Sequence, residues 1–148
     1  MRRVGPKPEA GRKYRARPGA YAILPKRGKV LLTAQFDDQF DIQLPGGGVD
    51  PGESSLAALH REVLEETGWS ITRPRRLGAF RRFVFMPEYD LWAEKICHIY
   101  IATPARKIRP ISEPCHEALW IPLPLAANVL ANEGDRSFVR DYASASRP

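Results

Sequence analysis

The segment from Gly47 to Trp69 constrains this chain more than any other. It joins a glycine turn to a stretch rich in helix-forming residues and carries four glutamates. On a helix that advances about 100° per residue, Glu62, Glu65 and Glu66 fall on one face. Like charges at this spacing destabilise an isolated helix by roughly 0.2–0.5 kcal/mol per pair. The crowding becomes favourable when divalent cations, which prefer oxygen ligands, lie among the carboxylates.

The same segment predicts the limits of the helix. It should begin near Glu53 or Ser54, because serine is a strong N-cap residue, and end at Gly68, which can adopt the left-handed conformation of a C-terminal cap. A separate arc of the helix should face the core. Its residues are Leu56, His60, Val63 and Thr67, with Leu59 at the border.

These residues resemble the signature of the Nudix hydrolases, the MutT-like superfamily. In that signature a glycine, five residues, a glutamate and seven residues lead into Arg-Glu-apolar-any-Glu-Glu-any-Gly-apolar. Every fixed position is filled here, although an aliphatic residue is more usual than Trp69. The filled positions are Gly47, Glu53, Arg61, Glu62, Val63, Glu65, Glu66, Gly68 and Trp69. The resemblance implies an α/β (α+β) fold, an α/β/α sandwich with a mixed β-sheet and a catalytic loop and helix.

The resemblance also implies a metal site. Glu62, Glu65 and Glu66, with the carbonyl of Gly46, would hold Mg²⁺, and Mn²⁺ could substitute. Many family members add a glutamate from a loop downstream of the helix. The candidates here are Glu113 and Glu117, which precede the apolar stretch around Trp120, with Glu94 as a third.

The implied catalytic set is Glu62, Glu65, Arg61 and Glu53. Glu62 would activate the attacking water. Arg61 and Glu53 would pair and fix the turn against the helix, because the rigid guanidinium fork binds a carboxylate at two points.

Three residues are predicted to bind the substrate: Arg81, Phe83 and Trp120. Arg81 and Arg82 are adjacent on an expected strand, so only one of them can face the site. The adjacent pairs Cys97-His98 and Cys115-His116 do not predict zinc, because neighbours on a strand point to opposite faces and no further spacing completes a tetrahedral site.

The positive charge is concentrated at the start of the chain. Residues 1–17 hold seven Lys or Arg against one acid and carry the whole net charge of +6. We expect a basic, flexible arm over 1–17 and a single domain over 18–148. The arm could tether RNA or a polyphosphate, or it could be a solvated tail.

The remaining pattern predicts a mixture of strands and helices. Strands are expected over 19–24, 29–34, 42–44, 76–85, 95–103 and 118–121, loops over 36–41 and 86–92, and helices over 123–132 and 137–143. No apolar run approaches the ~20 residues that span a bilayer. No apolar segment follows the basic N-terminus, and the two cysteines are too few for a disulfide framework, so we expect a cytoplasmic protein without a membrane partner. The resemblance implies a monomer or a homodimer.

Together these features predict a Mg²⁺-dependent hydrolase that cleaves the pyrophosphate bond of a nucleoside diphosphate linked to another group. The simplest substrate is a nucleoside triphosphate, giving a monophosphate and pyrophosphate. The alternatives are an RNA 5′-pyrophosphohydrolase, a dinucleoside polyphosphate or ADP-ribose hydrolase, and a non-catalytic nucleotide sensor or RNA-binding module.

Overall fold

The computed structural model describes residues 1–37 and 40–146. Residues 38–39 of the loop expected over 36–41, and residues 147–148 of the expected domain, lie outside the described residues. Two β-sheets form the centre of the molecule. The first has the order β1 (Arg2–Arg3), β7 (Trp69–Met86), β8 (Leu91–Lys107), β2 (Arg15–Ile23) and β6 (Gly46–Gly48). The second contains β3 (Pro25–Lys26), β4 (Lys29–Phe36), β5 (Phe40–Gln43) and β9 (His116–Pro122), which pairs with β4.

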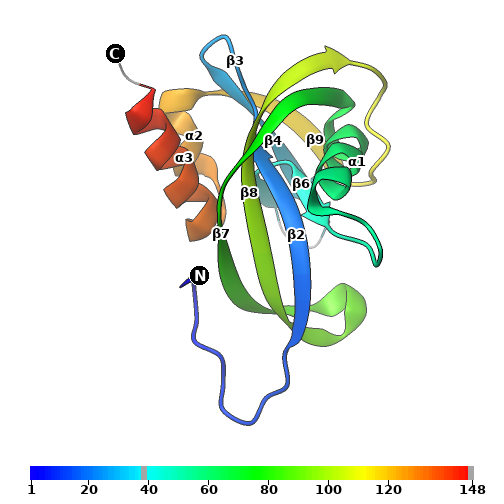
Figure 1. Cartoon of the computed structure of the whole chain (residues 1–148), viewed down its shortest axis with the longest axis vertical. Helices are drawn as coiled ribbons and strands as arrows, with labels where there is room; N and C mark the ends of the chain where they lie inside the picture. Colours follow the sequence, from blue (N-terminus) through cyan, green and yellow to red (C-terminus); the bar gives the residue numbers. More distant parts are fainter. Residues whose placement is uncertain (38–39, 147–148) are drawn as a thin grey trace.

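The helices lie on opposite sides of these sheets. Helix α1 (Ser55–Thr67) lies on one side, while α2 (Leu123–Val129) and α3 (Glu133–Ala145) lie together on the other (Figure 1). The first sheet is mixed, because β2 runs parallel to β8 and β7 runs antiparallel to it. The predicted α/β/α arrangement with a mixed sheet is therefore confirmed.

Two apolar cores hold the layers together. One lies on the side of α2 and α3 and includes Ile23, Phe80 and Leu130, all buried. The other lies beneath α1, where Leu59 and Val63 pack against residues from β2, β4 and β8. The face of β2, β7 and β8 that carries Tyr21, Phe80 and Cys97 in the first core continues along the strands toward the functional site.

Helix α1 has the predicted ends but a different core face. The Ser54 side chain accepts a hydrogen bond from the Ala57 amide at 3.0 Å, and Gly68 has a φ of 77°. Leu56 is 44% exposed and His60 is also exposed, so the prediction that both face the core was wrong. The buried face of the helix is instead the one that includes Glu66. Its other buried residues are Ala58, Leu59, Val63 and Thr67.

The long hairpin of β7 and β8 exceeds the strands predicted over 76–85 and 95–103. The two strands pair from Trp69↔Lys107 to Met86↔Leu91, because register shifts absorb the irregular stretch between 70 and 78 without ending the ladder. The short 3₁₀ helix η1 (Pro87–Tyr89) forms the tip, in the loop expected over 86–92.

Residues 1–17, expected as a flexible arm, are placed against the domain. Strand β1 pairs in parallel with β7, and Val4 is buried in the core with its amide donating to the Arg81 carbonyl at 2.8 Å. Further along, the Tyr14 ring contacts Phe83 with 4.9 Å between ring centroids. Strand β2 begins at Arg15, so the expected boundary at 17/18 falls inside a strand. Apolar and aromatic contacts that composition does not reveal attach this basic segment to the sheet.

In the described part of the chain, every helix is too short or too polar to cross a membrane.

Candidate active site

The glycine strand β6 brings the backbone against the carboxylates of α1. β6 pairs with β2, where Tyr21 lies opposite Gly46. A side chain at Gly46, whose φ is 146°, would collide with the Ala20 carbonyl. A Cβ at Gly47 would lie 2.5 Å from the Glu62 carboxylate. The absence of side chains at these two positions therefore lets Glu62 approach the turn.

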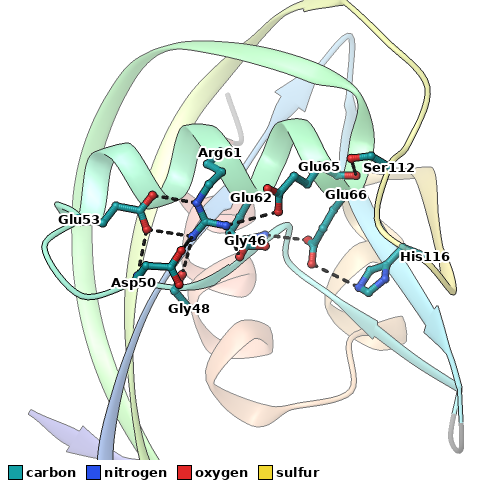
Figure 2. Close-up of polar contacts among 10 residues, drawn as sticks. All are labelled: Gly46, Gly48, Asp50, Glu53, Arg61, Glu62, Glu65, Glu66, Ser112 and His116. Atoms are coloured by element: carbon teal, nitrogen blue, oxygen red, sulfur yellow. Dashed lines mark hydrogen bonds and ion pairs between the residues drawn. The ribbon is translucent and has the colours of Figure 1, made fainter. Parts of the chain in front are cut away.

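Arg61 links the loop to three glutamates (Figure 2). Its Nε donates to Glu53 at 2.8 Å and its Nη2 donates to the other oxygen of Glu53 at 2.9 Å. Its Nη1 donates to Glu62 at 2.9 Å and more weakly to Glu65 at 3.4 Å, while Nη2 also donates to the Gly48 carbonyl at 3.0 Å. The hydrogen bonds from Arg61 lower the pKa of Glu53 to about 2. The predicted pairing of Arg61 with Glu53 is thus present in the structure.

Glu66 is the most enclosed carboxylate of the cluster, only 8% exposed. It accepts a hydrogen bond from the Gly46 amide at 3.0 Å, and its other oxygen lies 3.3 Å from Nε2 of His116. His116 Nδ1 donates to the Pro114 carbonyl at 2.8 Å. The hydrogen bond to Glu66 raises the pKa of His116 to about 9, so Nε2 carries the proton that it donates to Glu66. Burial raises the pKa of Glu66, and the contact with His116 opposes this effect.

Glu62 shows the electrostatic strain of the cluster most clearly. Burial, followed by the negative charge of Glu66, raises the pKa of Glu62 to about 7, although Arg61 acts in the opposite direction. In the described part of the chain, no three His, Cys, Asp or Glu side chains converge into a ready-made metal site. Instead Arg61 and His116 occupy the carboxylates. Three carboxylates face only two cationic partners here, so the all-oxygen donor set of Glu62, Glu65 and Glu66 fits a hard divalent cation.

Two cavities meet at this cluster. The larger, of about 650 Å³, is lined by Glu62, Glu66 and His116 together with Arg82 and Asp41. The smaller, of about 460 Å³, lies beside it. The residues that line both cavities are Tyr21, Gly48, Glu62, Met86, Tyr89 and Lys95.

The downstream glutamates occupy different surroundings. The Glu113 amide donates to the Glu65 carbonyl at 3.1 Å, and the charge of Glu113 contributes to raising the pKa of Glu66. Glu117 is exposed and pairs with Ala34 on β4. It follows His116 on β9, so its side chain points to the opposite face of the sheet from that of His116. Glu94 pairs with Arg81 at 3.2 Å. Of the three, Glu113 is linked to the cluster by its amide and its charge, and none of the three lines either cavity.

The three residues predicted to bind the substrate lie elsewhere. Arg81 forms the ion pair with Glu94, Phe83 packs on Tyr14, and Trp120 meets Trp69 edge-on with 5.5 Å between ring centroids. None of the three lines either cavity. Strand alternation turns Arg82 into the larger cavity and Arg81 away from it.

His116, Arg82 and Lys95 are residues of the site that sequence reasoning did not assign. The sequence pattern singles out His116 only as part of a possible zinc pair. The strand register that sets Lys95 opposite Arg17 and Arg82 is not visible in the sequence. The one feature of the sequence that points to Lys95 is a lysine within an otherwise apolar strand.

Comparisons with known proteins agree with this geometry. A family model described as NUDIX domain matches residues 13–142. A Bacillus subtilis (strain 168) protein named "Putative 8-oxo-dGTP diphosphatase" is 38% identical over 74 residues, which are 50% of this chain and 50% of that protein. An "RNA pyrophosphohydrolase" of Helicobacter pylori (strain G27) is 42% identical over 62 residues, 38% of this chain and 39% of that protein. The chain thus spans half or less of the length of these curated relatives.

Solved structures share the fold over most of the chain. A NUDIX hydrolase from Nitrosomonas europaea has a TM-score of 0.72 at 19% identity, covering 90% of this chain and 92% of that one. The MutT protein from Bacillus halodurans has a TM-score of 0.72 at 23% identity, covering 88% and 84%.

Proposed function

This chain belongs to the NUDIX domain family, and from that premise we propose that it hydrolyses the pyrophosphate bond of a nucleoside triphosphate, releasing a nucleoside monophosphate and pyrophosphate. Members of the family generally use divalent metal ions. We propose Mg²⁺, held by Glu62, Glu65 and Glu66, with the Gly46 carbonyl and Glu113 as candidates for further ligands. When bound, the ion would neutralise phosphate charge and polarise the bond that breaks.

One observation carries this proposal. Glu62 and Glu66 of α1 line a cavity of about 650 Å³ that Arg82 and Lys95 also line. Cations stabilise the negative charges of a phosphate chain. Here the sheet supplies the side chains of Arg82 and Lys95, and helix α1 supplies carboxylate ligands for the proposed Mg²⁺ ion. A cavity of this size is in the range that holds a small ligand.

The chain's own residues then have distinct tasks. A water attacks one phosphorus of the P–O–P bridge and its oxygen forms the new P–O bond. The bridging P–O bond breaks, and its electron pair leaves with the bridging oxygen on the departing pyrophosphate or nucleoside monophosphate. Glu62, which lines both cavities, accepts the proton of that water. Arg61 and Glu53 hold the loop, and His116 orients Glu66.

Removal of pyrophosphate from an RNA 5′ end is a second candidate. It involves the same bond, and relatives named RNA pyrophosphohydrolase support it. The structure adds one favourable observation, since Arg15 and Arg17 of the basic N-terminal segment line the smaller cavity.

The test is a panel of nucleotides with Mg²⁺ or Mn²⁺, with the products separated by chromatography. We expect one class to give a monophosphate and pyrophosphate, and Glu65→Gln to abolish the reaction. Glu133→Gln, which neutralises an exposed glutamate at the start of α3, is the matched control and should keep wild-type rates. If no nucleotide is cleaved while nucleotides still bind, the protein is a sensor and the proposal is wrong.

A further inference from the structure

Three cations form a row across neighbouring strands of the first sheet. Lys95 on β8 lies opposite Arg17 on β2 and opposite Arg82 on β7. Residues directly opposite one another in a sheet point to the same face, so the three side chains are adjacent. Neighbouring strands lie about 4.8 Å apart, so the row crosses about 10 Å of the sheet. We call Arg82, Lys95 and Arg17 the cation row.

The cation row is costly for the protein alone. Like charges placed directly opposite one another destabilise a sheet. In residues 1–37 and 40–146, these three side chains form no ion pair and no hydrogen bond. Burial lowers the pKa of Lys95 and the charge of Arg82 adds to this effect, while Cys97, Asp135 and Glu88 oppose it. An arrangement of this kind is favourable when an anion lies along it.

The cation row leads from the carboxylates of α1 into the second cavity. Arg82 lines the larger cavity with Glu66, Lys95 lines both cavities, and Arg17 lines the smaller one beside Arg15. Lys95 shares the junction of the cavities with Glu62. An anion that passes along the row would therefore begin at the proposed cleavage site and continue beyond it.

An exposed aromatic ring accompanies the row. Tyr89 is 55% exposed and lines both cavities. The guanidinium of Arg17 lies over the Tyr89 ring, 4.4 Å from its centroid. A positively charged groove with an aromatic ring beside it is the combination that binds single-stranded nucleic acid, because any base can stack on such a ring. An inorganic phosphate chain would make no use of the ring.

We propose that the cation row binds the first phosphodiester groups of a single-stranded oligonucleotide whose 5′ polyphosphate end lies at the carboxylates of α1. The proposal deepens the proposed function and rests on it for the position of the 5′ end. The larger cavity takes the 5′ nucleotide and its phosphates, and the smaller cavity takes the strand that follows. Arg17 is then a specificity residue for strand length.

Binding can be measured without cleavage. The probe is a 3′-fluorescein-labelled trinucleotide with a non-hydrolysable 5′ triphosphate, bound to the otherwise unchanged protein with Mg²⁺ and followed by fluorescence anisotropy at several salt concentrations. Arg17→Gln should weaken binding about tenfold, as expected for the loss of one charge-assisted contact. It should also reduce the slope of log affinity against log salt by about 0.7. Arg17→Lys should restore most of the slope.

Arg75→Gln is the matched control. Arg75 is an exposed arginine on β7 that pairs with Ile101, six residues along β8 from Lys95, or about 20 Å along the strand. Its replacement removes the same charge and should leave affinity and slope at the values of the wild-type protein.

Kinetics with a wild-type background complete the test. Arg17→Gln should lower kcat/KM for the triphosphorylated trinucleotide several times more than for the nucleoside triphosphate. Equal losses on both substrates, or a trinucleotide that binds with the affinity and salt slope of the mononucleotide, would overturn the inference. If the wild type cleaves neither substrate but the trinucleotide still binds through Arg17, the proposed hydrolysis fails and the binding site stands.

Discussion

The acidic and basic walls of the active-site cavity are built in opposite ways. The acidic wall comes from one helix, and its carboxylates are held by Arg61 and His116. The basic wall is the cation row, drawn from three strands and without ion-pair partners in the described part of the chain. The carboxylates of the acidic wall therefore have partners within the protein, whereas the basic wall relies on the proposed anion for its own.

The largest expected effect comes from the acidic wall. Glu62→Gln removes the proposed base without changing the size of the side chain, so kcat for nucleotide hydrolysis should fall by about 10²–10⁴. Initial rates of pyrophosphate release at several substrate concentrations give both kcat and KM. A fall in affinity at constant kcat would instead show that Glu62 only binds.

A smaller effect is expected from the brace of that wall. Arg61→Lys keeps the charge but loses the fork that contacts Glu53 at two points and also reaches Glu62. We expect a loss of about 10–100-fold in activity, the range for residues that orient metal ligands. The pH at which the rate is half-maximal should also shift, because Glu62 loses a hydrogen bond that lowers its pKa. An unchanged rate and pH profile would mean that the charge alone suffices.

The smallest effect on the site is expected from Asp135, a buried acid whose charge interacts with Arg82 and Lys95 and which makes the stability of the fold depend on pH. Asp135 is buried in α3, and burial raises its pKa to about 6, while the charges of Arg82 and Lys95 act in the opposite direction. The folded state prefers the neutral acid, so this group's contribution to stability is present below its unfolded pKa near 3.8 and is lost as pH rises to about 6.

Asp135→Asn cannot titrate and should remove this dependence. Between pH 4 and pH 7 the variant should gain up to about 3 kcal/mol in unfolding free energy relative to wild type, read from urea denaturation. Asp141→Asn, at an exposed site on the same helix, is the control. A constant difference between Asp135→Asn and wild type over this range would contradict the assignment.

The two walls also differ in what the sequence reveals. The acidic wall was predictable because its residues and the glycine turn are contiguous, so helical spacing alone brings Glu62, Glu65 and Glu66 to one face. The limits of α1 and the sandwich fold followed from the same segment. The basic wall was not predictable, because strand register decides that Lys95 lies between Arg17 and Arg82. Arg81, and not Arg82, is the substrate-binding residue predicted from the sequence. Side-chain alternation along a strand places the two arginines on opposite faces but does not say which face carries the site.

The basic N-terminal segment shows the same limit. Its charge indicated a solvated arm, yet Val4 enters the core and Arg12 lies over the Trp92 ring, 3.7 Å from its centroid. Composition does not reveal such contacts, because they depend on which surface the segment meets. Arg15 and Arg17 thereby become part of the cavity wall.

The central claim is that the face of α1 holds a divalent cation that hydrolysis requires. The most direct measurement follows Mn²⁺ binding by electron paramagnetic resonance and nucleoside triphosphate hydrolysis in the same samples, for wild type and Glu65→Gln. The account predicts that wild type binds Mn²⁺, that the rate rises with the bound fraction, and that Glu65→Gln loses both. Hydrolysis that continues at the wild-type rate in Glu65→Gln, or after chelation of all divalent cations, would contradict it.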